Sequence, residues 1–354
     1  MNDAKYIGLD VHQATISVAV RDAAGELVME AILETRAETI LQFLGGLRGT
    51  LQVALEEGTW AAWLHDLLQP HVARVVVCDS RKNPSMKKGN KSDRLDARKL
   101  ARLLRLGELQ GVYHGNTGLR MVKELARSYL TVTKDLIRVM NRLKAVYRAW
   151  GIPCAGQKVY APRYRAEWLG KISQVAVRRR AELYYQQLDA LRPLHQQARR
   201  ELLAEGNQHI ATKWLRRIPS IGPIRAVLLL ALMQTPHRFR TKRQLWTYSG
   251  LALETRDSGE YKVEHGQFRR SKKHPTIRGL NKNHNHDLKN IFKGAATHAA
   301  VSGPFQEFYA ARIARGMRVP MARLTLARKI AAIALAVWKK GVCFDAKYLK
   351  QQAA

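Results

Sequence analysis

The stretch Lys5-Tyr6-Ile7-Gly8-Leu9-Asp10-Val11-His12 decides the fold of the first part of the chain. It is an apolar run that ends in polar residues, a pattern typical of a buried strand. Residues 15–21 and 26–34 also have the pattern of strands, and Ala23-Ala24-Gly25 forms a turn between them. We therefore expect three successive strands at the start of the chain.

Strand and helix patterns alternate after these three strands. We expect an amphipathic helix ended by Gly45-Gly46, then a strand, a helix, a valine-rich strand and a helix, at residues 37–47, 51–55, 60–68, 73–78 and 92–106. Three strands followed by helix, strand, helix, strand and helix is the order of an α/β RNase H-like (RuvC-like) domain. We place this domain at residues 1–110.

Residues 111–210 have a helical pattern instead. Apolar residues between positions 119 and 139 recur mostly at steps of three and four, Gly151-Ile152-Pro153 ends this helix, and a second long helix is expected at 166–205. Two long helices in succession suggest an antiparallel coiled-coil arm, and a plain helical spacer is an equally good interpretation. A stripe of this length could also serve in oligomerisation.

Residues 211–345 are expected to form a mainly α-helical C-terminal domain, followed by a tail at 346–354. The Gly222-Pro223 turn precedes an apolar helix at 225–233, and its free backbone N–H groups could hold a phosphate. A simple tight turn is the alternative. The apolar helix at 321–340 is expected to belong to the core.

The charge of the chain indicates a polyanionic partner. Its 354 residues contain 61 Lys and Arg against 28 Asp and Glu, so the net charge is 61 − 28 = +33. Such an excess opposes folding by self-repulsion unless a polyanion neutralises it, and nucleic acid is the expected partner. No apolar run approaches the ~20 residues that span a bilayer. Three widely spaced cysteines and a start without a signal-peptide pattern favour a reduced, cytoplasmic protein.

Two stretches concentrate the positive charge. Residues 81–105 hold ten Lys and Arg with only Asp93 and Asp96 as acids, and residues 262–293 hold nine with only Glu264 and Asp287. We expect nucleic-acid contacts in both stretches and at the turn between them, from Arg81, Lys82, Lys87, Lys88, Lys91, Arg94, Gly222, Arg269, Arg270, Lys272, Lys273, Arg278 and Lys282.

Four carboxylates are candidates for a metal site. Asp10 lies near the end of the first strand, Glu56 follows the strand at 51–55, and Asp93 and Asp96 are three residues apart on one helix face. Residues from two strand ends and one helix can converge at a sheet edge and hold two Mg²⁺ ions, which prefer carboxylate oxygens.

Each of these acids also has a purely structural interpretation. Asp10 could be a turn residue, Asp93 a helix cap, and Asp96 the partner of a neighbouring arginine. Glu56 is favoured over the adjacent Glu57, because Leu55 and Glu57 share the opposite face of an extended chain. Two acids kept inside a basic stretch favour metal ligation.

Three motifs resemble those of the DEDD transposases of insertion-sequence family 110, including its 1111 subgroup. They are Gly8-Leu9-Asp10-Val11-His12, Ala54-Leu55-Glu56-Glu57-Gly58-Thr59 and Lys91-Ser92-Asp93-Arg94-Leu95-Asp96-Ala97-Arg98-Lys99-Leu100. The C-terminal part resembles the same family at Ile218-Pro219-Ser220-Ile221-Gly222-Pro223, Tyr248-Ser249-Gly250-Leu251, Ser258-Gly259, Arg278-Gly279-Leu280 and Ala327-Arg328-Lys329-Ile330.

This resemblance implies a mobile-element recombinase. In the family, the carboxylates hold Mg²⁺ and a serine of the C-terminal domain becomes covalently linked to DNA; here that residue would be Ser258, while Ser249 looks like a packing residue. Family members are guided by a structured bridge RNA and assemble as dimers and tetramers, in which serine and carboxylates can come from different subunits. The protein would then act on donor and target DNA at the bacterial nucleoid.

Three other functions are consistent with parts of the sequence. One is an RuvC-like nuclease that uses water and forms no covalent adduct, and another is a non-catalytic DNA- or RNA-binding protein. The third is an actin-like ATPase or sugar kinase, whose first strand also reads Gly-Leu-Asp. That fold needs further glycine-rich phosphate loops, which the sequence does not contain, and the +33 charge fits it badly.

Overall fold

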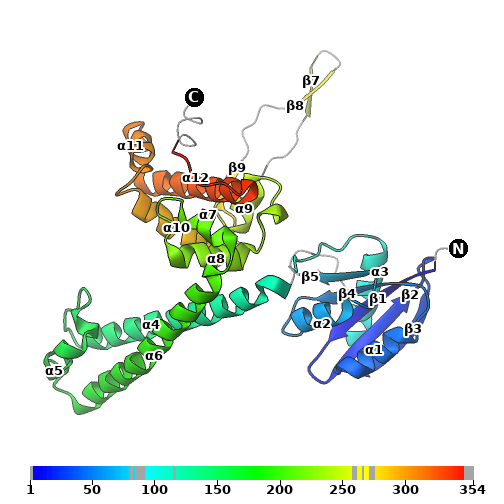
Figure 1. Cartoon of the computed structure of the whole chain (residues 1–354), viewed down its shortest axis with the longest axis horizontal. Coiled ribbons are helices and arrows are strands. Elements are labelled where there is room, and N and C mark those ends of the chain that lie inside the picture. The colour runs from blue at the N-terminus through cyan, green and yellow to red at the C-terminus, as the bar shows by residue number, and fades with distance from the viewer. Residues whose placement is uncertain are drawn as a thin grey trace. The chain divides into compact units, whose positions relative to one another are not determined.

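The structure is a computed structural model that describes residues 3–79, 83, 92–114, 117–256, 261–264, 267–270 and 276–346. Its chain divides into two compact units, Met1–Gly115 and Asn116–Ala354. Most helices and strands of the two units are labelled in Figure 1. Within the described residues, no helix combines the length and the apolarity needed to cross a bilayer.

A five-stranded mixed sheet forms the centre of the first unit, with strand order β3-β2-β1-β4-β5. Neighbouring strands are antiparallel from β3 to β1 and parallel from β1 to β5. The strands are β1 Ala4–Val11, β2 Thr15–Arg21, β3 Leu27–Glu34, β4 Thr50–Glu56 and β5 Arg74–Cys78. This order and these directions are compatible with the RNase H-like fold that the sequence predicts.

Helices cover both faces of this sheet. On one face, Leu9 and Leu55 pack with α1 (Ala37–Gly45) and α2 (Ala61–Leu68) in one apolar core. On the other face, Ala54 and Cys78 pack against α3 (Asp93–Arg105). Leu55 and Ala54 face opposite ways because side chains alternate along a strand. All the predicted elements of this unit are present, with ends that differ by at most two residues.

The second unit begins with two long helices, α4 (Arg120–Ala149) and α6 (Val175–Asn207). They run antiparallel, because Tyr147 lies against Tyr185 and Tyr129 against His195. The short helix α5 (Arg165–Gly170) lies between them in the sequence. Figure 1 shows α5 beside the end of the pair where α4 finishes and α6 begins.

The sequence pattern predicted a single helix at 166–205, and this was wrong. The chain leaves the helix after Gly170 and re-enters it at Val175. Ile172 turns into the apolar core between α4 and α6 and is buried there. The Arg178 guanidinium donates to the Ile172 carbonyl from Nε (3.1 Å) and Nη2 (2.7 Å), which holds the turn. Burial of Ile172 therefore outweighs the local preference for a continuous helix.

The remainder of the second unit is a mostly helical body around one large apolar core. Its helices are α7 Ile210–Arg216, α8 Pro223–Met233, α9 Lys242–Tyr248, α10 His286–Ala299, α11 Gln306–Ala314 and α12 Val319–Lys340. Four short strands pair as β6 with β9 and β7 with β8, at Leu253–Arg256, Tyr261–Glu264, Gln267–Arg270 and Thr276–Leu280. The helical character and the core position of α12 agree with the sequence.

A candidate metal centre and nucleic-acid interface

Helix α3 lies directly on strand β1 because Gly8 has no side chain. A Cβ added at Gly8 would lie 2.1 Å from the Ala97 carbonyl oxygen and 2.6 Å from the Ala101 nitrogen. Ala97 and Ala101 are themselves fully buried, together with Ala19 of β2. This close approach places the start of α3 beside the end of β1.

Asp10, His12 and Asp93 meet at that place. The His12 Nε2 atom lies 3.3 Å from Asp10 Oδ2 and 3.5 Å from Asp93 Oδ1. One ligand atom from each of the three residues lies within 4.8 Å of the other two. Asp93 is not the helix cap, because Ser92 Oγ accepts a hydrogen bond from the Leu95 N–H and fills that role. The Asp93 carboxylate is therefore not occupied by capping α3.

Glu56 lies next to Asp10 on the neighbouring strand. Leu9 is paired with Leu55 in the parallel register, so the residues that follow, Asp10 and Glu56, are side by side at the ends of β1 and β4. Both face α3, whereas Leu55 is buried on the opposite face and Glu57 is exposed. The Glu56 carboxylate is not among the atoms that lie within 4.8 Å of one another around Asp10.

Asp96 lies one turn further along α3 and contacts a cation. Its Oδ1 is 2.9 Å from Lys99 Nζ, and both side chains are partly buried. The sequence offered a structural interpretation in which Asp96 pairs with a neighbouring arginine. Asp96 does pair with a neighbouring cation, but this cation is Lys99. Asp96 is still near enough to Asp10 to raise the pKa of its carboxyl.

The electrostatics of this group suit a cation. Burial raises the pKa of Asp10 above its ordinary value; His12 lowers it, and Asp93 and Asp96 raise it again. A carboxylate whose pKa is raised by burial and by neighbouring carboxylates is stabilised by a positive ion beside it. Two carboxylates and an imidazole within ligand distance of one another fit a divalent cation in donor chemistry. Burial and then Glu56 raise the pKa of the nearby Cys78 thiol to about 12.

His12 was quoted in the sequence only as the last residue of the first strand, and its place in the site was missed. A signal for it is present, because His12 follows Asp10 by two positions and side chains two apart on an extended chain share a face. The contact with Asp93 could not be read from that spacing, since it depends on where α3 packs.

The basic residues of α3 divide into two groups. Arg98 makes a two-pronged ion pair with Glu30 of β3, with distances of 2.7 and 2.5 Å, and Lys99 contacts Asp96. Arg105 donates to the Ala23 carbonyl oxygen. Arg94, by contrast, is exposed beside Asp93 at the start of the helix. Part of this basic stretch therefore stabilises the fold, while Arg94 is accessible to a ligand.

Several predicted contacts lie outside the described residues. These are Ser258, Arg81, Lys82, Lys87, Lys88, Lys91, Lys272 and Lys273, and the side chains of Arg270 and Arg278 are also outside them. Arg269 on β8 and Lys282 before α10 are exposed. Gly222 is the N-cap of α8 and has no side chain to cap the helix. Ser249 is fully buried and donates from Oγ to the Leu245 carbonyl oxygen at 2.7 Å, as expected of a packing residue.

Two family models of known proteins match parts of this chain. Residues 7–149 match the family model for DEDD transposases of the IS110 type. Residues 212–310 match the model described as transposase IS116/IS110/IS902 family. The chain is similar to IS110-family transposases. The IS110 resemblance thus covers nearly all of the first unit, all of α4 and much of the C-terminal body.

The chain is also similar to a candidate transposase of Sinorhizobium fredii, to which it is 27% identical over 178 residues. The match covers 48% of this chain and 41% of the relative, so the chain spans less than half the length of that protein.

Proposed function

We propose that this chain is a transposase of the IS110 type, which cleaves and rejoins DNA strands of a mobile insertion sequence. The observation that carries the proposal is the meeting of Asp10, His12 and Asp93 at the end of a mixed sheet, in a chain that matches models of this family at residues 7–149 and 212–310. The net charge of +33 supports a nucleic-acid substrate.

The carboxylates of Asp10, Glu56, Asp93 and Asp96 would hold divalent cations, of which Mg²⁺ is the best fit to oxygen donors. When bound, two such ions stabilise charge on the attacking and the leaving oxygens of a phosphodiester. His12 would orient Asp10 and Asp93, because it lies within 3.5 Å of a carboxylate oxygen of each. The ion pair with Lys99 would hold the Asp96 carboxylate in a fixed orientation on α3.

Ser258 would supply the nucleophile. Its hydroxyl oxygen forms a bond to phosphorus while one sugar–phosphate ester bond breaks, and the departing sugar hydroxyl takes up the proton. The hydroxyl of a second strand then attacks the phosphoserine and releases Ser258. Rejoining needs no external energy source, because the phosphoserine keeps the phosphodiester's energy between the two steps. A water nucleophile would lose it.

The partners would be donor and target DNA, a structured guide (bridge) RNA and further copies of the chain. The α4–α6 pair would act as an arm for assembly into a homodimer or homotetramer, with carboxylates and serine shared between subunits. Exposed apolar side chains on this pair support that role, among them Met121, Ile137, Leu183 and Leu194.

The decisive experiment is to purify the full chain with its co-bound nucleic acid, sequence that material, and incubate the complex with donor and target DNA. A covalent protein–DNA adduct on a denaturing gel, formed only with a divalent metal, is the expected result. Cleavage without an adduct would favour the RuvC-like nuclease that uses water. Binding without any cleavage would favour the non-catalytic nucleic-acid-binding protein.

A further inference from the structure

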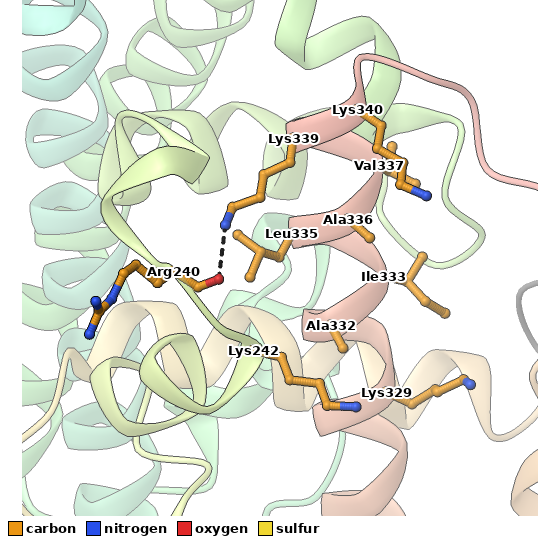
Figure 2. Close-up of a pocket in the computed structure, with 10 residues that line it drawn as sticks. All are labelled: Arg240, Lys242, Lys329, Ala332, Ile333, Leu335, Ala336, Val337, Lys339 and Lys340. Carbon is orange, nitrogen blue, oxygen red and sulfur yellow. Dashed lines mark hydrogen bonds between the residues drawn. The ribbon is translucent and has the colours of Figure 1, made fainter. Parts of the chain in front are cut away.

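A pocket lies beside α12 in the C-terminal body, well separated in sequence from the carboxylates. Its volume is about 360 Å³, within the ~300–1,000 Å³ of pockets that bind small molecules. Residues of α12 and of the segment that leads into α9 line it, and Figure 2 shows them. They are Arg240, Lys242, Lys329, Ala332, Ile333, Leu335, Ala336, Val337, Lys339 and Lys340.

One stripe of α12 combines apolar and positive side chains. Ala332 and Ala336 are four residues apart and half-buried, and their small size leaves the space that the pocket occupies. Lys329 and Lys340 bracket these alanines, about 16 Å apart along the helix axis at 1.5 Å per residue. Figure 2 shows both lysines on the same side of α12 as Ala336.

The opposite wall is held in place by a lysine of α12. Lys339 Nζ donates to the carbonyl oxygens of Phe239 and Arg240, at 2.5 and 3.2 Å. The bond to Arg240 is drawn in Figure 2. It ties the chain just before α9 to the end of α12, and Lys242 then stands beside Lys329 at the rim. These two hydrogen bonds hold the backbone of one wall of the pocket in place.

The charge around the pocket has one sign. Five of its ten lining residues are basic, and no acidic residue of the described chain lines it. Lys329 is only 8% exposed. Burial lowers the pKa of Lys329, and the nearby Lys242 and Arg312 lower it further. Cations that crowd one another around an apolar floor are stabilised by an anion placed among them.

We propose that this pocket binds an unpaired nucleotide of a nucleic-acid strand. The base would lie on the apolar floor of Ala332 and Ala336, and the phosphates on either side of it would contact Lys329 with Lys242 at one end and Lys340 at the other. A fully paired duplex offers phosphates but no free base, so it can use the rim and not the floor. The flexible stems of the lysines allow the charges to reach inward along the 16 Å stripe.

This inference deepens the proposed function, since it rests on nucleic acid as the partner, but it does not need catalysis. It can therefore be tested by binding alone, with the full chain in EDTA. The probes are fluorescein-labelled RNA and DNA duplexes, each made fully paired and with one bulged nucleotide. Because the bulged base buries apolar surface that a paired base cannot bring to the floor, the bulged probe should bind about fivefold or more tighter than the paired one. The RNA and DNA arms identify which strand supplies the nucleotide.

Two variants separate the floor from the rim. Ala336→Trp fills the pocket without changing charge, so the preference for the bulged probe should vanish while paired-duplex affinity stays the same. Lys242→Ala with Lys340→Ala should weaken binding of both probes and lower the slope of log K against log salt by about two. Arg200→Ala, an exposed cation of α6 outside the pocket, is the control for simple loss of charge.

Cross-linking gives an answer that does not depend on folding of the variants. A thio-substituted base at the bulge should cross-link to peptides that contain residues 240–242 or 329–340 of the wild-type chain. Equal affinity of the wild type for bulged and paired probes would overturn the proposal, and so would cross-links confined to other peptides. A preference that survives Ala336→Trp, in a variant with an unchanged melting temperature, would overturn it as well. If the wild-type chain prefers the bulged probe as expected but does not recombine DNA, only the proposed function is contradicted.

Discussion

Gly8 of β1 and Ala97 of α3 meet backbone to backbone, so closely that a Cβ on Gly8 would lie 2.1 Å from the Ala97 carbonyl oxygen. The two residues come from different elements, and this contact sets the distance between them. It also determines that Asp93, four residues before Ala97, lies beside Asp10, two residues after Gly8. The geometry of the candidate metal centre thus depends on the missing side chain of Gly8, although Gly8 is not itself a candidate ligand.

We expect Gly8→Ala to push α3 away from the sheet. The added methyl group meets backbone that cannot move aside easily, so the free energy of unfolding should fall by about 1–3 kcal/mol. Urea denaturation followed by circular dichroism measures this. The control is Gly45→Ala at the end of α1, where a Cβ meets nothing within 4 Å. Equal stability of the two variants would mean that α3 does not rest on Gly8.

Loss of a carboxylate should remove metal binding together with activity. Asp10→Asn and Asp93→Asn should abolish adduct formation and the rise in melting temperature on adding Mg²⁺, while Glu38→Gln, on an exposed residue of α1, should change neither. His12→Ala should weaken Mg²⁺ binding by about 10–100-fold, as loss of a group that orients metal ligands does. Calorimetric titration measures the affinity, and wild-type affinity in Asp93→Asn would take Asp93 out of the site.

The ion pair between Arg98 and Glu30 should make the packing of α3 on the sheet sensitive to acid. Its hydrogen bonds to Arg98 lower the pKa of Glu30. Because the pKa of Glu30 is lower in the folded state, the ion pair stabilises the fold fully at pH values above the unfolded-state pKa of ~4.3. This stabilisation is lost as the pH falls through the folded-state pKa. The coupling energy from a double-mutant cycle with Arg98→Met and Glu30→Gln should be present at pH 7 and disappear in that acidic window. A coupling energy that stays constant with pH would contradict this.

Ser258→Ala should bind DNA and RNA normally but form no covalent adduct on a denaturing gel. The hydroxyl of Ser249 is buried and donates to Leu245, so Ser249→Ala should keep the adduct at the cost of some stability. An adduct that persists in Ser258→Ala would place the nucleophile elsewhere. Absence of an adduct in the wild type would favour the nuclease that uses water.

The basic stretch at 81–91 should contribute to salt-dependent binding. Replacing Lys87, Lys88 and Lys91 by Ala should reduce the slope of log K against log salt by up to about three, because each phosphate contact releases about one counterion. Fluorescence anisotropy at salt concentrations from about 50 to about 300 mM measures this slope. The matched control is Lys144→Ala with Arg199→Ala and Arg200→Ala on α4 and α6. A slope that changes only in the control would show that the stretch does not touch nucleic acid.

Local sequence patterns were enough to predict the strands and helices of the first unit and the candidate carboxylates. Side-chain alternation and helical periodicity are local, so β1 could be recognised from residues 5–12 and α3 from residues 92–106. The choice of Glu56 over Glu57 follows from the same alternation, which places Leu55 in the opposite core.

Tertiary packing alone decided the remaining features, because each joins residues that are distant along the chain. His12 joins the candidate metal centre only where α3 meets β1, and Arg98 is tied to Glu30, 68 residues away. The long helix at 166–205 is broken where Ile172 finds an apolar core that local propensity does not register. One wall of the pocket beside α12 is held by Lys339, which donates to carbonyl oxygens about a hundred residues earlier in the chain. Local periodicity reports which face of an element is apolar, whereas the partner of that face is chosen by the packing of the whole unit.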